Sequence, residues 1–154
     1  MPGASQSGWP TPPLRGKLKE AGSTAERWAR LVLIAADAES DLPTAKAWAA
    51  TVGVSYSTLR DVCNIVRVST HDSRDFMRLL RALLRTGGDL DHIEDQLYVG
   101  DERTLASLLR KTGLHGHERS RVTIDEFVQR QCFIPAERPV LTAVSRLLSG
   151  LLVA

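Results

Sequence analysis

The residues of this chain that could do chemistry on their own are few and scattered. His115 and His117 are separated by one residue in "LHGHE", and Cys132 follows at a distance. A structural zinc site is closed by a full tetrahedral set of ligands at short spacings, and this set lacks its last member. The segment "STHDS" places Ser, His and Asp side by side, whereas a catalytic triad needs geometry across a fold. We therefore expect no metal, no cofactor and no catalysis.

The two cysteines and the N-terminal segment suggest a compartment. Cys63 and Cys132 lie in no metal-spaced or redox pair, so a reduced intracellular chain is the simplest interpretation. The opening "MPGASQSGWPTPP" lacks the basic-then-apolar architecture of a signal peptide. No run approaches the roughly 18 consecutive apolar residues that a membrane span needs. We expect a cytoplasmic protein with no membrane partner.

The composition favours a helical protein with an uneven surface charge. The chain has 154 residues, of which 43% are apolar and only 5% are aromatic, and Ala, Leu, Val and Arg are abundant. That mixture is typical of helices rather than of a sandwich or barrel. Residues 55–86 carry six Arg against three Asp, whereas residues 89–102 carry six acidic residues and no Lys or Arg. A protein that coats DNA without sequence preference would not usually contain this acidic interruption.

Apolar residues recur at helical spacing along most of the chain, and polar capping residues mark where helices begin. Ser23 and Glu26 have the spacing of a capping box, as do Thr123 and Glu126. The helix starts that we expect lie at or near Ser23, Thr44, Asp72, Asp89, Asp101, Thr123 and Val140, with one more after the polar loop "VSYS" at 54–57. No alternating strand pattern of useful length appears. The predicted fold class is all-α, with about eight helices.

The stretch "VGVSYSTLRDV", Val52–Val62, has the spacing of a helix-turn-helix corner. Its glycine can take the positive φ that often ends a first helix. A short polar loop follows, and Leu59, Val62 and Cys63 then form an apolar face that can hold the second helix against the first. A similar pattern, "YVGDERTLASLL", recurs at 98–109.

The chain from about Ala25 to Gly113 resembles the DNA-binding domain of AraC/XylS-type transcription regulators. "AWAATVGVSYSTLRDVC" resembles the family's first unit, "FMRLLRAL" the start of its linker helix, and "IEDQLYVGDERTLASLLRKTG" its second unit. The resemblance implies two helix-turn-helix subdomains joined by a linker helix, whose second helices enter the major groove of double-stranded DNA. The second unit matches less well, because Glu94 stands where a small residue is usual and Tyr98 where the turn glycine is.

The outward residues at the start of each second helix are the candidate DNA contacts. They are Tyr56, Ser57, Arg60 and Asp61 in the first unit, and Arg103 and Ser107 in the second. Arg60 could pair bidentately with guanine, which is worth about 1–3 kcal/mol of discrimination. Tyr56 could donate to a phosphate, and Asp61 could orient Arg60 or accept from cytosine. The alternative for both sets is a solvated helix face, and the acidic neighbours of the second set favour the first unit as the main reader.

Four arginines recur every three or four residues on the helix between the two units: Arg74, Arg78, Arg81 and Arg85. Helical spacing places them on one side, opposite an apolar stripe that includes Phe76. Such a ridge is either a solvated face or a contact with the DNA backbone. Arg74 and Arg78 are therefore further candidates for DNA binding.

The chain divides into a flexible arm at 1–22, a double helix-turn-helix domain at 23–113 and a helical extension at 114–154. The arm is rich in Pro, Gly and Ser, and its basic piece "LRGKLKEAG" is either a solvated tail or a contact with phosphates. The last run, Val140–Val153, presents a wide apolar face. It could complete the core, or it could pair with a second copy in a homodimer.

These patterns together predict a sequence-specific DNA-binding transcription regulator without a fused ligand-sensing domain. The alternative is a helical protein–protein interaction module on the same scaffold, with little or no DNA binding. The acidic segment 89–102 and the uncharged end "LLSGLLVA" favour this alternative. The salt dependence of binding distinguishes these two hypotheses, because DNA binding weakens steeply as the salt concentration rises.

Overall fold

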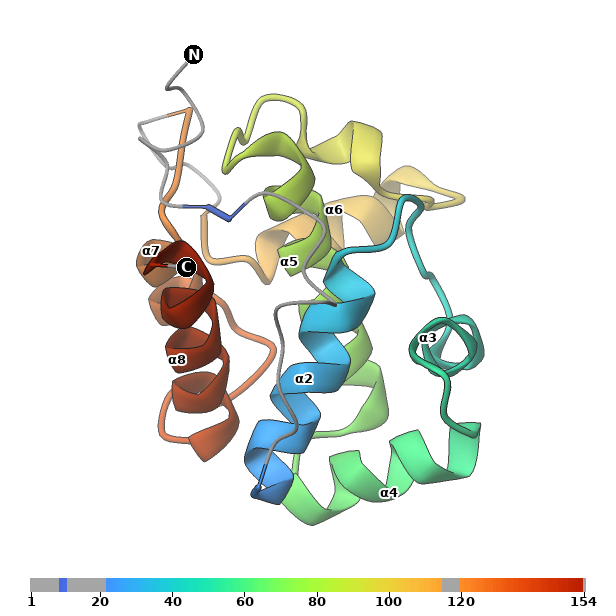
Figure 1. Ribbon diagram of the computed structural model, residues 1–154. Coiled ribbons are helices and arrows are strands. Elements are labelled where there is room, and N and C mark those ends of the chain that lie inside the picture. The colour runs from blue at the N-terminus through green and yellow to red at the C-terminus, as the bar shows by residue number, and fades with distance from the viewer. Residues whose placement is uncertain (1–8, 11–21, 115–119, 154) are drawn as a thin grey trace.

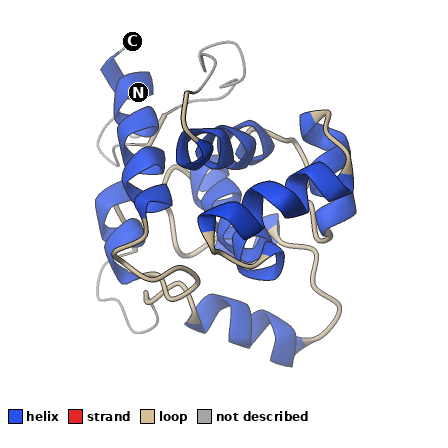
Figure 2. Cartoon of the chain, turned by 90° about the horizontal axis from the view of Figure 1, so that it is seen from below, coloured by secondary structure: helices blue, strands red, loops and turns tan. Residues whose placement is uncertain are grey.

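The computed structural model describes residues 9–10, 22–114 and 120–153, and every named element in these ranges is a helix. The α-helices are α2 (Thr24–Ala36), α3 (Ala45–Val52), α4 (Tyr56–Val66), α5 (Thr70–Thr86), α6 (Glu102–Arg110), α7 (Ile124–Arg130) and α8 (Pro139–Val153). A single 3₁₀ turn, η2 (Ile93–Gln96), precedes α6. Figures 1 and 2 show helices joined by loops, with α8 and α4 on different sides of α2. The all-α prediction is confirmed.

Side-chain caps begin most of these helices where the sequence indicated. Ser23 and Thr123 each accept a hydrogen bond from the backbone N–H of a glutamate three residues on, whose carboxylate accepts from the cap's own N–H. Thr44 caps α3, and Asp101 caps α6. The bonds matter because the first N–H groups of a helix have no partner within it.

The corner between α3 and α4 has the features that the sequence predicted for the first unit. Gly53 ends α3 in the left-handed conformation, at φ +80°, and Ser55 caps α4 by accepting from the N–H of Thr58 at 3.0 Å. Leu59, Val62 and Cys63 are buried in the core, and α4 packs against both α2 and α3. The two helices are therefore fixed to the rest of the bundle by the apolar side of α4.

Helix α5 is buried on all sides over residues 75–84, which the sequence did not predict. Its apolar stripe is buried as expected, including Phe76 and Leu80, but Arg78 and Arg81 on the opposite side are buried as well. The helix contacts α2, α3, α4 and η2. The prediction of one exposed arginine ridge was therefore wrong for Arg78 and Arg81.

The buried arginines instead hold two irregular segments against α5. Arg81 and Arg85 both donate to the carbonyl of Ala38, at 2.8 and 3.2 Å, just after the end of α2. Arg81 also donates to the carbonyl of Gln96 at 3.0 Å. Backbone carbonyls at a helix C-terminus lack partners and carry partial negative charge, so guanidinium groups bind them well. Burial lowers the pKa of Arg81 from its usual value.

Arg78 makes the deepest ion pair, with Asp41. Its Nη2 lies 2.6 Å from Oδ2 of Asp41 and also donates to the carbonyl of Tyr98 at 3.0 Å. The Asp41 carboxylate accepts the backbone N–H of Tyr98 at 2.7 Å. The Arg78 guanidinium therefore binds Asp41 and the backbone at Tyr98. Because Arg78 is buried, it is not the exposed contact for the DNA backbone that the sequence had predicted.

The second unit lacks the first helix that the sequence predicted. Only the 3₁₀ turn η2 forms there, and its N-cap position, His92, makes no side-chain cap bond. Asp89 is not a cap; its carboxylate accepts from the N–H of Asp91 and bonds to His92. The stretch 97–101 is then non-helical and leads directly into α6. Residues 89–101 together form a strap over α5, and Arg78 and Arg81 of that helix bond to the strap backbone at Tyr98 and Gln96.

The C-terminal helix completes the core. Helix α8 packs along α2, and the buried side chains of its inner face are Val140, Leu141, Ala143, Val144, Leu148 and Leu151. Arg146 of α8 also pairs with Glu26 in the first turn of α2. Of the two uses considered for this run, burial in its own chain is therefore observed, while pairing with a second copy stays a prediction.

Trp9, near the N-terminus, packs into the bundle. Trp9 is buried, and its indole N–H donates to the carbonyl of Val122 at 2.7 Å, so the prediction of a solvated arm was wrong at this residue. The basic piece of the arm lies outside the described residues.

The loop after α6 packs tightly against the end of α7. Gly113 has φ +71°, and a Cβ there would lie 1.8 Å from the carbonyl oxygen of Arg130. The loop after α6 therefore approaches the end of α7 too closely for any side chain. None of the helices in the described ranges combines the length and the apolarity that a membrane crossing requires.

Candidate functional site

The outer face of α4 carries all four residues predicted for the first unit. Tyr56, Ser57, Arg60 and Asp61 are exposed, while the opposite side of the same helix is buried. A helix with one side buried in the core and its first two turns projecting into solvent can enter a groove without unfolding. Figure 1 shows α4 crossing the base of the bundle, below α2.

Arg60 is already oriented by its neighbour one turn earlier. Its guanidinium carbon lies 5.7 Å from the centre of the Tyr56 ring, which is a cation–π contact on the surface. The contact restricts the arginine side chain but occupies none of its N–H donors. Arg60 therefore keeps the planar donor fork that recognises guanine or phosphate.

Two exposed residues further along α4 were missed from the sequence. Asn64 lies four residues after Arg60, and Ile65 follows it with 66% of its surface exposed. Helical spacing from Ser57 and Arg60 was the available signal for Asn64, since positions i, i+3 and i+4 share a face. Asparagine can bond adenine bidentately, and an exposed isoleucine can contact a thymine methyl group.

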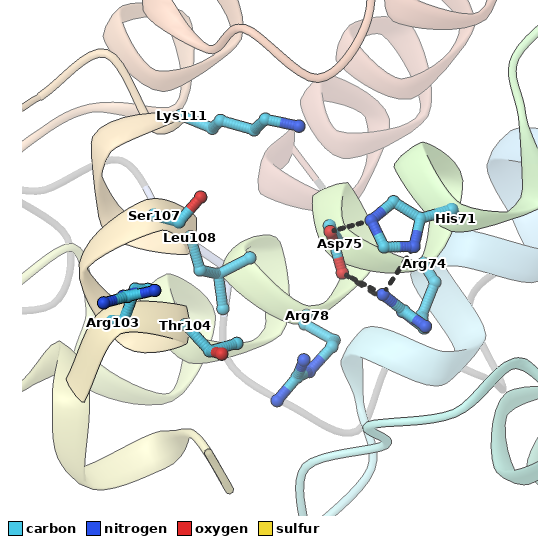
Figure 3. A pocket seen from close by; sticks show the side chains of 9 residues that line it. All are labelled: His71, Arg74, Asp75, Arg78, Arg103, Thr104, Ser107, Leu108 and Lys111. Carbon is cyan, nitrogen blue, oxygen red and sulfur yellow. Dashed lines mark hydrogen bonds and ion pairs between the residues drawn. The ribbon is translucent and has the colours of Figure 1, made fainter. Parts of the chain in front are cut away.

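The other four predicted residues lie together in a cleft between α5 and α6. Arg74 and Arg78 of α5 face Arg103 and Ser107 of α6 across a hollow of about 340 Å³ (Figure 3). The sequence placed Arg74 and Arg78 on the linker helix and Arg103 and Ser107 in the second unit, 25 or more positions away, and gave no sign that they meet. The remaining lining residues are His71, Asp75, Thr104, Leu108 and Lys111.

The α5 wall of the cleft is internally paired. Arg74 donates to Nδ1 of His71 at 2.9 Å and to Oδ1 of Asp75 at 3.0 Å. The other nitrogen of His71, Nε2, lies 3.2 Å from Oδ2 of Asp75. Because Arg74 can only donate, Nδ1 must accept and Nε2 must carry the proton that His71 shares with Asp75. The three side chains form a closed network at the start of α5.

The α6 wall carries fewer internal bonds. Lys111 Nζ lies 3.9 Å from Oδ1 of Asp72, at the limit of an ion pair, and 5.9 Å from the centre of the Phe133 ring. Thr104 is used in capping, since its hydroxyl donates to Asp101 at 3.0 Å. Within the described part of the chain, no carboxylate pairs with Arg103. The α6 wall therefore offers positive charge that the protein itself does not neutralise.

A second hollow, of about 420 Å³, lies on another side of α6. Its floor is formed by Leu105, Ala106 and Leu109, and charged side chains border it: Glu94, Glu102 and Arg110. Leu105 and Leu109 are only partly buried, and Leu108 is the one buried residue of this helix. Helix α6 is therefore held by few apolar contacts and flanked by two hollows.

The described residues hold no group of three or more His, Cys, Asp or Glu side chains that could bind a metal. His115 and His117 lie outside these residues. Cys63 is a buried core residue as predicted, and burial raises the pKa of its thiol. In "STHDS", Ser69 caps α5 and Ser73 accepts from the indole of Trp28 at 3.0 Å, so neither hydroxyl bonds to His71.

No family model matches the chain, and searches of curated proteins and of solved structures return no match either. The resemblance to AraC/XylS-type regulators therefore stays a prediction that rests on the quoted motifs alone.

Proposed function

We propose that the protein binds double-stranded DNA in a sequence-dependent manner, with α3 and α4 as a single helix-turn-helix and α4 as the reading helix. One observation carries the proposal: the first two turns of α4 project polar and cationic side chains into solvent, while its apolar side is locked against α2 and α3. Rigid placement of a few side chains is what base readout requires.

In this proposal the residues of α4 have distinct roles. Arg60 bonds a guanine edge, steadied by the Tyr56 ring beneath it, and Ser57 contacts backbone or base. Asn64 extends the reading surface by one turn. Asp61 limits the choice of base, because a carboxylate is repelled by phosphates and accepts only from a donor such as the amino group of cytosine.

The proposal places reading on one unit rather than two. Because η2 replaces the first helix of the second unit, α6 lacks the supporting helix that would set it in a groove. A single reading helix contacts few base pairs, so we expect a short recognition sequence, or two half-sites where two copies bind together.

Selection of bound sequences from a random duplex library, followed by titration of the selected and a scrambled duplex, tests the proposal. Arg60→Ala should weaken binding to the selected duplex by about 5- to 150-fold, as expected for loss of a bidentate contact worth roughly 1–3 kcal/mol. Binding to the scrambled duplex should change far less.

Arg130→Ala is the matched control, because Arg130 is exposed on α7 and its loss changes the net charge by the same amount. Equal losses on both duplexes for Arg60→Ala would show that Arg60 contributes only charge. A library that yields no bound sequence at low salt would reject the proposal altogether.

A second candidate function, a protein-interaction module, is favoured by the apolar hollow on α6. Its leucine floor and its two glutamates suit an amphipathic helix with basic residues beside its apolar face. Affinity for such a partner should fall only modestly with salt, whereas DNA binding falls with a log–log slope of about −0.9 per phosphate contact. Leu105→Ser should weaken the partner complex and leave duplex binding unchanged.

A further inference from the structure

The cleft between α5 and α6 has cationic side chains on both walls. Arg74 and Arg78 come from α5, Arg103 from α6 and Lys111 from the C-cap position that follows α6, so four cationic side chains line the hollow against one carboxylate, Asp75. In Figure 3 Lys111 reaches toward α5, while Arg103 lies over the α6 ribbon and Arg74 lies beside His71 and Asp75. A concave site with positive walls concentrates field lines and attracts anions more strongly than a convex surface of equal charge.

Part of this charge is neutralised within the protein, and the remainder lies mainly on α6. Asp75 is paired with Arg74 and His71, and Arg78 is paired with Asp41. Lys111 has only the 3.9 Å contact to Asp72. The side chains left to bind an incoming anion are therefore Arg103 and Lys111, supported from the other wall by Arg74.

The donors on α6 are aligned along the cleft. Arg103, Ser107 and Lys111 lie at i, i+4 and i+8, so they form one row on the helix surface. Eight residues of helix span roughly 12 Å, and the two long cationic side chains can reach toward the hydroxyl of Ser107 between them. A guanidinium fork, a hydroxyl and an ammonium group together match the several acceptor oxygens of a phosphate.

The size of the hollow favours a small ligand over a nucleic-acid duplex. Its volume of about 340 Å³ is at the lower end of the range for small-molecule sites. Leu108, which also lines the hollow, is buried and supplies apolar surface to it.

We propose that the α5–α6 cleft binds a small anion carrying one or two phosphate groups, held between the Arg103–Ser107–Lys111 row and Arg74. Such a ligand would join α6, which has one buried residue, to α5, which is the centre of the core. Anything that binds the folded state alone stabilises it by mass action. Occupancy would therefore stabilise α6 against local opening. The site is separate from α4 and does not depend on the proposed DNA reading.

Titration of the full chain with sodium phosphate and with sodium pyrophosphate, at ionic strength held constant with NaCl, tests this assignment. Calorimetry should give saturable binding, and amide NMR shifts should concentrate at 71–78 and 103–111. Arg103→Gln and Lys111→Gln should each raise the dissociation constant at least tenfold. Arg103 is exposed and the Lys111 side chain is 44% exposed, so neither substitution should disturb the fold. Circular dichroism of each variant checks this.

Arg110→Gln is the matched control, because it removes the same charge from α6 but lies on the other hollow. Loss of affinity in Arg110→Gln equal to that in Arg103→Gln would reduce the effect to general charge and overturn the proposal. Absence of saturable binding would also overturn the proposal. If Arg103→Gln weakened only duplex DNA binding, the proposal would likewise fail, and Arg103 would be assigned to a contact with the DNA backbone. Arg60→Ala should bind pyrophosphate as the unaltered protein does, so failure of either proposal is seen independently of the other.

Discussion

Helices α4 and α6 begin with similar sequences but are held very differently. Each follows a Val-Gly pair and a polar loop, and each begins its apolar face with Thr-Leu. In α4 that leucine, Leu59, is fully buried and packs with Val62 and Cys63, whereas in α6 the matching Leu105 is only partly buried. The difference lies in what precedes each helix: α3 supports α4, and only the short turn η2 stands before α6.

The comparison shows that the second helix of such a corner depends on the first. Helix α3 presents Trp48, Ala49 and Val52 to the core, and the indole N–H of Trp48 donates to the carbonyl of Leu31 in α2 at 3.1 Å. The corresponding part of the second unit buries only Ile93 and Leu97. With so little apolar surface, the segment is fixed by polar bonds to α5 instead, and α6 remains weakly packed.

The largest expected effect comes from breaking the bond that fixes this second segment. Asp41→Ala should lower the free energy of unfolding by about 3–5 kcal/mol, because it leaves the buried guanidinium of Arg78 without its carboxylate. Denaturant unfolding measures the change. Asp91→Ala, an exposed carboxylate on the same strap, is the control and should alter stability little. Similar losses in both variants would mean that Asp41 and Arg78 are not a buried pair in solution.

The two matched leucines give the next largest effect and test the comparison directly. Leu59→Ala should destabilise by about 2–5 kcal/mol, because it empties space in a packed core. Leu105→Ala should cost less than about 1.5 kcal/mol, because less apolar surface is removed from contact. The measurement is the same denaturant titration of both variants. Equal costs would contradict the difference in packing between α4 and α6.

The smallest expected effect is a pH dependence of folding stability that comes from the Asp89–His92 pair. Hydrogen bonding to Asp89 raises the pKa of His92, and the same bond lowers the pKa of Asp89. The contribution of His92 to folding stability is present below the usual histidine pKa, about 6.5, and is lost as pH rises through the raised pKa. The contribution of Asp89 is present above the usual aspartate pKa, about 4, and is lost as pH falls through the lowered pKa. The pair should therefore help stability mainly between about pH 4 and 6.5.

NMR titration of the His92 ring checks this prediction. Its pKa should lie above the usual value in the unaltered protein and return toward it in Asp89→Asn. Asp95→Asn is the matched control, since Asp95 makes only a minor Coulombic contribution to the pKa of His92. An unchanged His92 titration in Asp89→Asn would show that the 2.9 Å contact does not form in solution.

Local sequence determined the helices, their caps and the corner at Gly53. Capping boxes at Ser23 and Thr123, the positive φ of Gly53 and the buried row Leu59–Val62–Cys63 all follow from short-range pattern, because these features depend on residues within one or two turns. The exposed face of α4 follows from the same spacing. A reader of the sequence could therefore identify Tyr56, Ser57, Arg60 and Asp61 as surface residues without any structure.

Only the tertiary structure decided which of the α5 arginines are buried and how the second unit is held. Helical spacing correctly put Arg74, Arg78, Arg81 and Arg85 on one side of α5, but it could not show that the 37–41 loop and the strap would cover that side. Nor could it show that Arg74 would face Arg103 across a cleft, since that depends on how α6 packs against α5. Spacing fixes which side chains share a face, whereas the packing of distant segments decides whether that face meets water, protein or a ligand.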